Sequence, residues 1–157
     1  MFVDGSARLL VFRLGAERFA VSLADVDEVI DAPAVQRLPD APSVVLGISP
    51  IRGAWMTVYN PRPLLHLPAK HDVGGRNDGA ALLFIRDDKR IALEVDDVFD
   101  ALTVSEDEMR PPPSIGIADG FVTGVIRRGA ELIAVLDCVA LLGAATAATV
   151  DVGERKH

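Results

Sequence analysis

Residues 44–60 read V-V-L-G-I-S-P-I-R-G-A-W-M-T-V-Y-N, and this stretch decides the fold. Two apolar runs flank Arg52-Gly53, a pair typical of a tight turn, so the stretch predicts a β-hairpin with one charged side chain at its tip. In the second strand, alternation puts Trp55, Thr57 and Tyr59 on one face and Ala54, Met56 and Val58 on the other. A long cation fixed between two strands suits contact with a partner better than catalysis. A solvated hairpin arginine is the other interpretation.

The residues before this hairpin predict further short strands. Residues 9–14, L-L-V-F-R-L, form an apolar run that ends at a turn. In residues 18–23 bulky apolar side chains alternate with small or polar ones, and this period of two predicts a half-buried strand. Residues 24–30 carry their apolar positions at helix-like spacing, in a segment short for a helix.

The second half of the chain repeats the first. Aligning Phe12 with Phe84 gives an offset of 72 (84 − 12), at which R-F-A-V-S-L lies over R-I-A-L-E-V. An insertion then shifts the offset to 77, where Gly47 meets Gly124 (124 − 47). A duplicated unit of about five short strands predicts two small β-barrels or sheets packed with pseudo-twofold symmetry and a groove between them.

This repeat sets the expected boundaries of the domain. We predict one all-β domain over residues 8–146, with halves at 8–69 and 80–142 joined by a polar linker at 70–79. The Ala- and Leu-rich residues 138–148 predict a closing helix, and 147–157 a flexible tail.

Composition excludes several classes of protein. Hydrophobic residues make up 50% and charged residues 25%, typical of a globular domain. The net charge of -7 disfavours nucleic acid as a partner, because phosphate binding needs a basic surface. No apolar run is long enough to insert in a membrane, the N-terminus has no signal-like segment, and the single Cys138 cannot form an internal disulfide. We therefore expect a cytoplasmic protein.

The chain carries few signs of catalytic or ligand chemistry. There is no phosphate-binding loop and no dinucleotide-binding glycine motif. His66, His71 and His157 do not pair at metal-ligand spacing with each other or with Cys138. The acidic pairs at 87–88 and 96–97 fit a hairpin turn and a strand end better than a general acid and base. We expect no enzymatic activity, no cofactor and no metal.

Several short segments follow one another along the chain: the opening L-V-F-R-L-G-A-E-R-F-A-V, V-D-E-V at 26–29, L-P-D-A-P before Gly47, I-R-G at 51–53, V-D-D-V at 95–98 and the prolines at 111–113. In this order they resemble the motifs of the family of the chemotaxis coupling protein CheW, and the resemblance covers nearly the whole chain. The family fold is two five-stranded SH3-like β-barrels, which agrees with the repeat.

This resemblance implies a non-enzymatic adaptor that couples methyl-accepting chemoreceptors to a CheA-type histidine kinase. It assigns receptor contact to Arg52 and Glu28, with Trp55 as an unusual apolar anchor if exposed, and kinase contact to Val26 and Gly47. The receptor's helical hairpin tip would lie in the groove, and membrane receptor arrays would recruit the protein from the cytoplasm.

Two departures cluster at the central hairpin. Pro50 stands where many members have asparagine, and Asn60-Pro61 where the strand usually ends Asp-Leu. They indicate an alternative: a regulator of the same fold that acts outside a chemotaxis array, in pilus motility or other signalling, with a diverged partner surface. A small-molecule binding protein that uses the groove is a third class.

Overall fold

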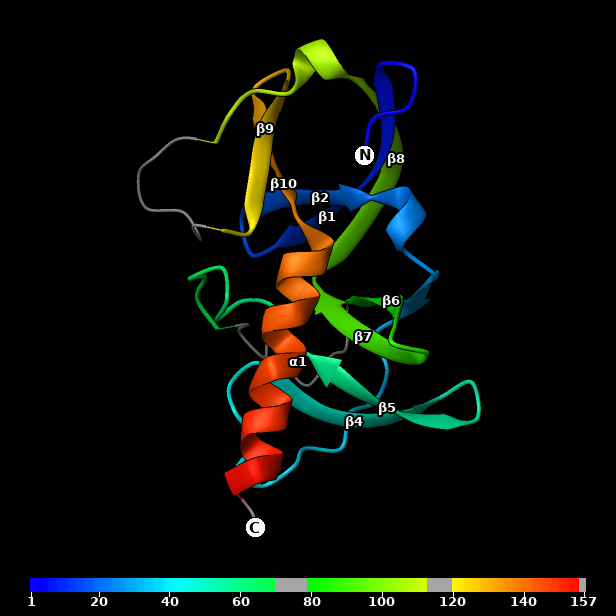
Figure 1. The fold of residues 1–157 in the computed structure, drawn as a ribbon, viewed down its shortest axis with the longest axis vertical. Coiled ribbons are helices and arrows are strands. Elements are labelled where there is room, and N and C mark those ends of the chain that lie inside the picture. The colour runs from blue at the N-terminus through cyan, green and yellow to red at the C-terminus, as the bar shows by residue number, and fades with distance from the viewer. Residues whose placement is uncertain (70–78, 113–119, 156–157) are drawn as a thin grey trace.

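The computed structural model describes residues 1–69, 79–112 and 120–155, and shows a β protein with one long helix (Figure 1). All of the predicted linker 70–79 except Gly79 lies outside these residues. The elements in chain order are β1 (Ser6–Leu14), β2 (Glu17–Ser22), the 3-10 turn η1 (Leu23–Asp25), β3 (Glu28–Asp31), β4 (Val45–Ile51), β5 (Ala54–Tyr59), β6 (Ala80–Arg86), β7 (Lys89–Val95), β8 (Asp97–Ser105), the 3-10 turn η2 (Glu106–Glu108), β9 (Val122–Arg128), β10 (Glu131–Leu136) and α1 (Cys138–Arg155).

The strands form two five-stranded sheets, and each sheet takes strands from both repeats. Sheet A has the order β8-β1-β2-β10-β9, and sheet B has the order β3-β6-β7-β5-β4. The repeat matches each strand of sheet A with one strand of sheet B: β1 with β6, β2 with β7, β8 with β3, β9 with β4 and β10 with β5. Replacing each strand of sheet A by its counterpart gives the strand order of sheet B. The predicted pseudo-twofold relation therefore holds between sheets, whereas the contiguous halves 8–69 and 80–142 are not separate packing units.

The strand registers agree with both predicted offsets. Phe12 pairs with Phe19 in sheet A, and Phe84 pairs with Ile91 in sheet B. Gly47 lies opposite Val58, just as Gly124 lies opposite Val135. The repeat seen in the sequence is therefore a repeat of hydrogen-bonding register.

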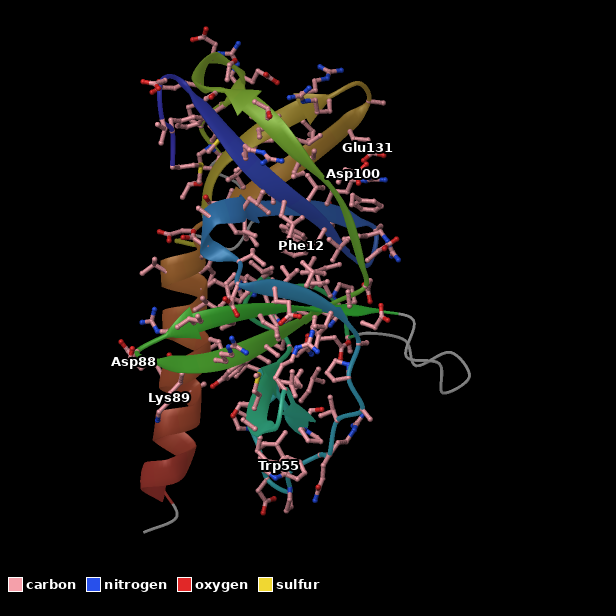
Figure 2. The ribbon with its side chains drawn as sticks, turned by 90° about the vertical axis from the view of Figure 1, so that its right-hand side faces the viewer. Phe12, Trp55, Asp88, Lys89, Asp100 and Glu131 are labelled. Carbon is pink, nitrogen blue, oxygen red and sulfur yellow. The ribbon has the colours of Figure 1, made fainter. Side chains whose placement is uncertain are left out.

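Three apolar clusters explain why the inner strands β1, β2, β6 and β7 are buried on both faces. The central core lies between the sheets and α1, and Phe12 occupies its middle (Figure 2). Each sheet also curls around a smaller core of its own. The sheet A core is Ala7, Leu9, Val11, Ala20, Val104, Ile126, Ile133 and Val135, and the sheet B core is Ile51, Met56, Val58, Ala81, Leu83 and Ala92.

This arrangement corrects the prediction that residues 18–23 form a half-buried strand. Phe19 and Val21 face the central core, but the small residue Ala20 between them is fully buried in the sheet A core. Ala20 packs there among larger apolar side chains such as Leu9 and Ile133, so a small residue in the alternation does not mark a solvated face.

The structure also decides the segment 24–30, whose helix-like spacing left its conformation open. It does not form a helix: a 3-10 turn at Leu23–Asp25 leads into β3, which pairs with β6. Tertiary pairing overrides the local spacing here. The C-terminal helix is confirmed, but α1 continues to Arg155, into the predicted tail 147–157. Alanines at 144, 145, 147 and 148 favour helix continuation, and Leu141, Leu142 and Ala145 fix the helix to the central core.

Candidate functional site

The tip of the β4–β5 hairpin is the two-residue turn that the sequence predicted. Arg52 and Gly53 have φ values of 53° and 79°, the left-handed pair of a type I′ turn. Glycine adopts this conformation freely, whereas arginine pays a steric penalty for it. The turn therefore places a charged side chain at a defined position at the end of sheet B.

Arg52 and Glu28, both predicted as receptor-binding residues, form an ion pair with each other. Arg52 Nε donates to Glu28 Oε2 at 3.3 Å, and Arg52 Nη2 donates to Glu28 Oε1. β3 and β4 are the opposite edges of sheet B, so this forked contact joins the two edges of the curled sheet.

The ion pair shifts the titration of both groups. The hydrogen bond from Arg52 is the largest effect and lowers the pKa of Glu28; desolvation opposes it, and the positive charges of Arg52 and Arg90 add to the lowering. The hydrogen bond to Glu28 and its negative charge raise the pKa of Arg52. Both groups are therefore charged at neutral pH.

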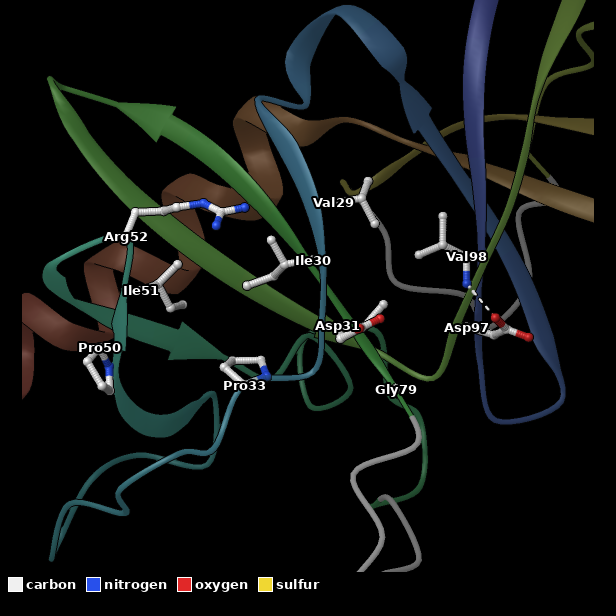
Figure 3. A pocket seen from close by; sticks show the side chains of 11 residues that line it. Val29, Ile30, Asp31, Pro33, Pro50, Ile51, Arg52, Gly79, Asp97 and Val98 are labelled. Carbon is white, nitrogen blue, oxygen red and sulfur yellow. Dashed lines mark hydrogen bonds between the residues drawn. The ribbon is translucent and has the colours of Figure 1, made fainter.

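A groove of about 750 Å³ lies beside this pair, where sheet B meets the start of β8. Its apolar lining comes from Val29, Ile30 and Pro33 around β3, Pro50 and Ile51 on β4, and Val98 on β8, with Asp31, Arg52 and Asp97 as its charged groups (Figure 3). Val29 is 42% exposed. Apolar side chains lie here among polar and charged groups that make up most of the exposed lining, and an open groove of this mixed kind suits a helical or extended protein segment.

Trp55 is 63% exposed and lines a different hollow. This second hollow is bounded by β5, the β6–β7 hairpin and Thr146 of α1, and it shares only Ile51 and Arg52 with the groove. Trp55 projects from the end of sheet B, away from Phe12 and the middle of the molecule (Figure 2). Trp55 is thus exposed as an anchor would be, but it does not line the groove.

The two predicted kinase-binding residues are more buried. Val26 is half-buried and packs against the central core. Gly47 is buried, and a Cβ there would lie 2.1 Å from the backbone oxygen of Gln36, so glycine lets the loop before β4 cross the strand closely. Gly124 plays the same role beneath Met109 and Arg110.

A buried ionic network was missed by the sequence analysis. Arg62 is only 2% exposed, and its Nη2 donates to Asp96 Oδ1 at 2.8 Å. Asn60 Oδ1 accepts from Arg62 Nη1 at 2.9 Å and from the Arg62 backbone N–H at 3.1 Å, and Glu94 lies 3.8 Å from Nη1. Arg62 stands between two prolines and looks like a loop residue. One signal of this network was present in the sequence. When the repeats are aligned at the offset of 72, the charged Asp96 of the second repeat matches the small apolar Ala24 of the first.

The described part of the chain holds no group of three or more His, Cys, Asp or Glu side chains arranged for a metal ion. Desolvation, followed by the negative charges of Asp25 and Asp137, raises the pKa of the buried Cys138 thiol to about 12. No helix among the described residues is both long and apolar enough to cross a bilayer.

The fold and the groove define a class: an all-β domain of two interleaved five-stranded sheets that presents an open groove beside a hairpin arginine. The sequence pattern described as "CheW-like domain" matches residues 8–146. The chain therefore belongs to the CheW family, as the motifs of its sequence indicated.

Relatives and a solved structure agree with this family. A protein named chemotaxis protein CheW from Treponema pallidum is 27% identical over 137 residues, which cover 85% of this chain and 81% of the relative. A protein of the same name from Klebsiella aerogenes is 23% identical over 94% of this chain and 89% of its own length. The crystal structure of the scaffolding protein TtCheW from Thermoanaerobacter tengcongensis superimposes with a TM-score of 0.71 at 22% identity, over 83% of this chain and 88% of that chain, which establishes the fold.

Proposed function

We propose that this protein is a non-enzymatic scaffold in chemosensory signalling, which couples methyl-accepting chemoreceptors to a CheA-type histidine kinase from the cytoplasmic side of the membrane. The observation that carries the proposal is the groove between the sheets, with Arg52 held at its edge by Glu28. Family membership supports the same role. The apolar side chains of this mixed lining would contact the helical hairpin tip of the receptor, and the polar and charged groups among them would orient it.

Within this proposal Arg52 contacts the receptor while Glu28 positions it. The ion pair holds the guanidinium at the groove, and its remaining N–H donors can reach carbonyl or carboxylate groups of the receptor. Gly47 and Val26 act on kinase binding through shape: Gly47 keeps the 35–36 loop close to β4, and Val26 supports the start of β3.

Binding to two separate partners tests the proposal. Calorimetry should detect micromolar or tighter binding to the regulatory domain of a cognate CheA-type kinase, and separately to a receptor tip fragment. Arg52→Ala should weaken receptor binding and leave kinase binding and the melting temperature unchanged. Arg8→Ala, an exposed arginine on sheet A, is the matched control and should change neither.

The pKa shift of Glu28 adds a test by pH. Because pairing with Arg52 lowers this pKa below its ordinary value of 4.5, the carboxylate keeps the pair intact above that value and loses it as the pH falls through the lowered pKa. Receptor affinity should therefore be constant around neutral pH and fall only in acid. Glu28→Gln should bind weakly at neutral pH already, whereas Glu17→Gln should behave as wild type. Equal receptor affinity of Glu28→Gln and wild type at neutral pH would remove Glu28 from the site.

One observation favours the alternative, a regulator of this fold outside a chemotaxis array. Pro50 lies opposite Trp55 at the groove end of the hairpin, so this departure from the family pattern lies on the proposed partner-facing surface. β4 is an edge strand, where proline is tolerated without loss of a ladder to a second neighbour. Absence of binding to every CheA-type regulatory domain tested, with the fold intact, would favour this alternative.

A further inference from the structure

We propose that Asp96 and Arg62 are positioning residues that fix the sheet A wall of the groove relative to sheet B. Asp96 lies where the chain passes from β7 of sheet B to β8 of sheet A. The two residues that follow it, Asp97 and Val98, form the sheet A side of the groove. The position of Asp96 therefore sets the position of this wall.

Asp96 is held from three directions. Its Oδ2 accepts from the Gly15 N–H at 2.6 Å, which ties it to the β1–β2 turn of sheet A. Its backbone N–H donates to Arg13 O at 2.9 Å, and its Oδ1 accepts from Arg62 at 2.8 Å. Arg62 follows β5, so a single carboxylate joins the ends of strands from both sheets.

The pseudo-twofold repeat provides an internal comparison. At the second sheet junction Asp96 corresponds to Ala24, and Arg62 corresponds to Val139, which is exposed (62 + 77 = 139). The fold therefore forms one of its two equivalent junctions without this network. A buried ion pair is an inefficient way to add stability, because desolvation of the charges offsets their attraction. Directional hydrogen bonds do fix geometry, and they occur at the junction that borders the groove.

The network also accounts for Asn60, one of the departures from the family pattern. Asn60 accepts from both the side chain and the backbone of Arg62, so it holds the guanidinium toward Asp96. Its counterpart Asp137 instead accepts from the Ala140 N–H at the start of α1. Asn60 therefore acts on the groove through Arg62 rather than through contact with a partner.

The test measures the groove without any partner. Spin labels are attached at Val29→Cys on β3 and Asp100→Cys on β8, and pulsed electron paramagnetic resonance gives the distance between the labels. The native Cys138 is buried and stays unlabelled. The labelled parent protein should show one narrow distance distribution. Arg62→Met and Asp96→Asn should broaden or shift it, whereas Asp107→Asn, the same change on an exposed side chain of η2 outside the groove, should leave it unchanged.

An unchanged distribution in folded Arg62→Met and Asp96→Asn overturns the inference. Arg62→Lys keeps the charge but loses the forked donors, and it should give an intermediate distribution if the methionine variant fails to fold. The functional consequence rests on the proposed function: receptor-tip affinity should fall on the order of tenfold, with kinase affinity unchanged. If the distribution changes while the parent protein does not bind a receptor tip, the positioning role holds and the receptor function fails.

Discussion

The matched phenylalanines of the central core allow a quantitative prediction. Phe12 and Phe84 occupy equivalent positions, and their exposed fractions are 0% and 1%. Removing a buried phenylalanine side chain loses about 1.5–3 kcal/mol of transfer free energy. The cavity left behind raises the total cost of Phe→Ala to about 3–5 kcal/mol.

The two sites differ in one neighbour, and this difference should be measurable. Phe12 lies opposite Phe19 with ring centroids 6.0 Å apart, whereas Phe84 lies opposite Ile91. An aromatic pair adds about 0.5–1.5 kcal/mol beyond area burial. Phe12→Ala should therefore lower the free energy of unfolding by that much more than Phe84→Ala, and in a Phe19→Ile background the difference should disappear.

Urea unfolding followed by circular dichroism is the assay, with the exposed Leu132→Ala as control, expected to change stability by less than about 0.5 kcal/mol. At about 2–4 °C per kcal/mol, the core variants should also melt roughly 6–20 °C lower than the parent. A cost below about 1 kcal/mol at either phenylalanine would refute the two-repeat register. Equal costs at both sites would refute the contribution assigned to the aromatic pair.

Three further predictions concern single sites. Gly47→Ala should destabilise more than Gly129→Ala in thermal melts, because a Cβ at 47 meets Gln36 at 2.1 Å while nothing lies within 4 Å at 129; equal melting temperatures would contradict the close packing of this loop. Cys138 should resist alkylation at pH 8, where a pKa of about 12 leaves a thiolate fraction of about one in ten thousand, and should react rapidly once urea unfolds the protein; fast native labelling would contradict its burial. Trp55, the only tryptophan, should show solvent-exposed emission that iodide quenches; a kinase or receptor fragment that contacts it should shift the emission to the blue.

The elements and the duplication could be predicted because they leave local patterns. Alternation in residues 18–23 and the pair Arg52-Gly53 depend only on neighbouring residues, and the offset that joins Phe12 to Phe84 follows from comparing two such patterns. Arg52 and Glu28 were selected through family motifs, and the structure brings them into contact.

The pairing between repeats could not be predicted in the same way. Alternation shows which face of β1 is apolar, but it does not show that its outer neighbour is β8. The network of Arg62 and Asp96 leaves no periodic pattern in the sequence, because these residues come into contact only after the chain has crossed between the sheets. The direction of Trp55, away from the groove, depends on the curl of sheet B and not on its place in a motif.

The exchange of strands between repeats has a consequence for how the protein is made. The hairpin of β1 and β2 leaves the ribosome first, but β8, the outer partner of β1, begins only at Asp97. Ser6 at the start of β1 can pair only after Ser105 has been synthesised. At roughly 5–20 residues per second, the edge of β1 stays open for on the order of 5–20 s. During this time an apolar strand with unpaired amides is available to other nascent chains. The first repeat alone cannot complete either sheet, so chains that terminate early should aggregate, and chaperones that shield strand edges should raise the yield of folded protein.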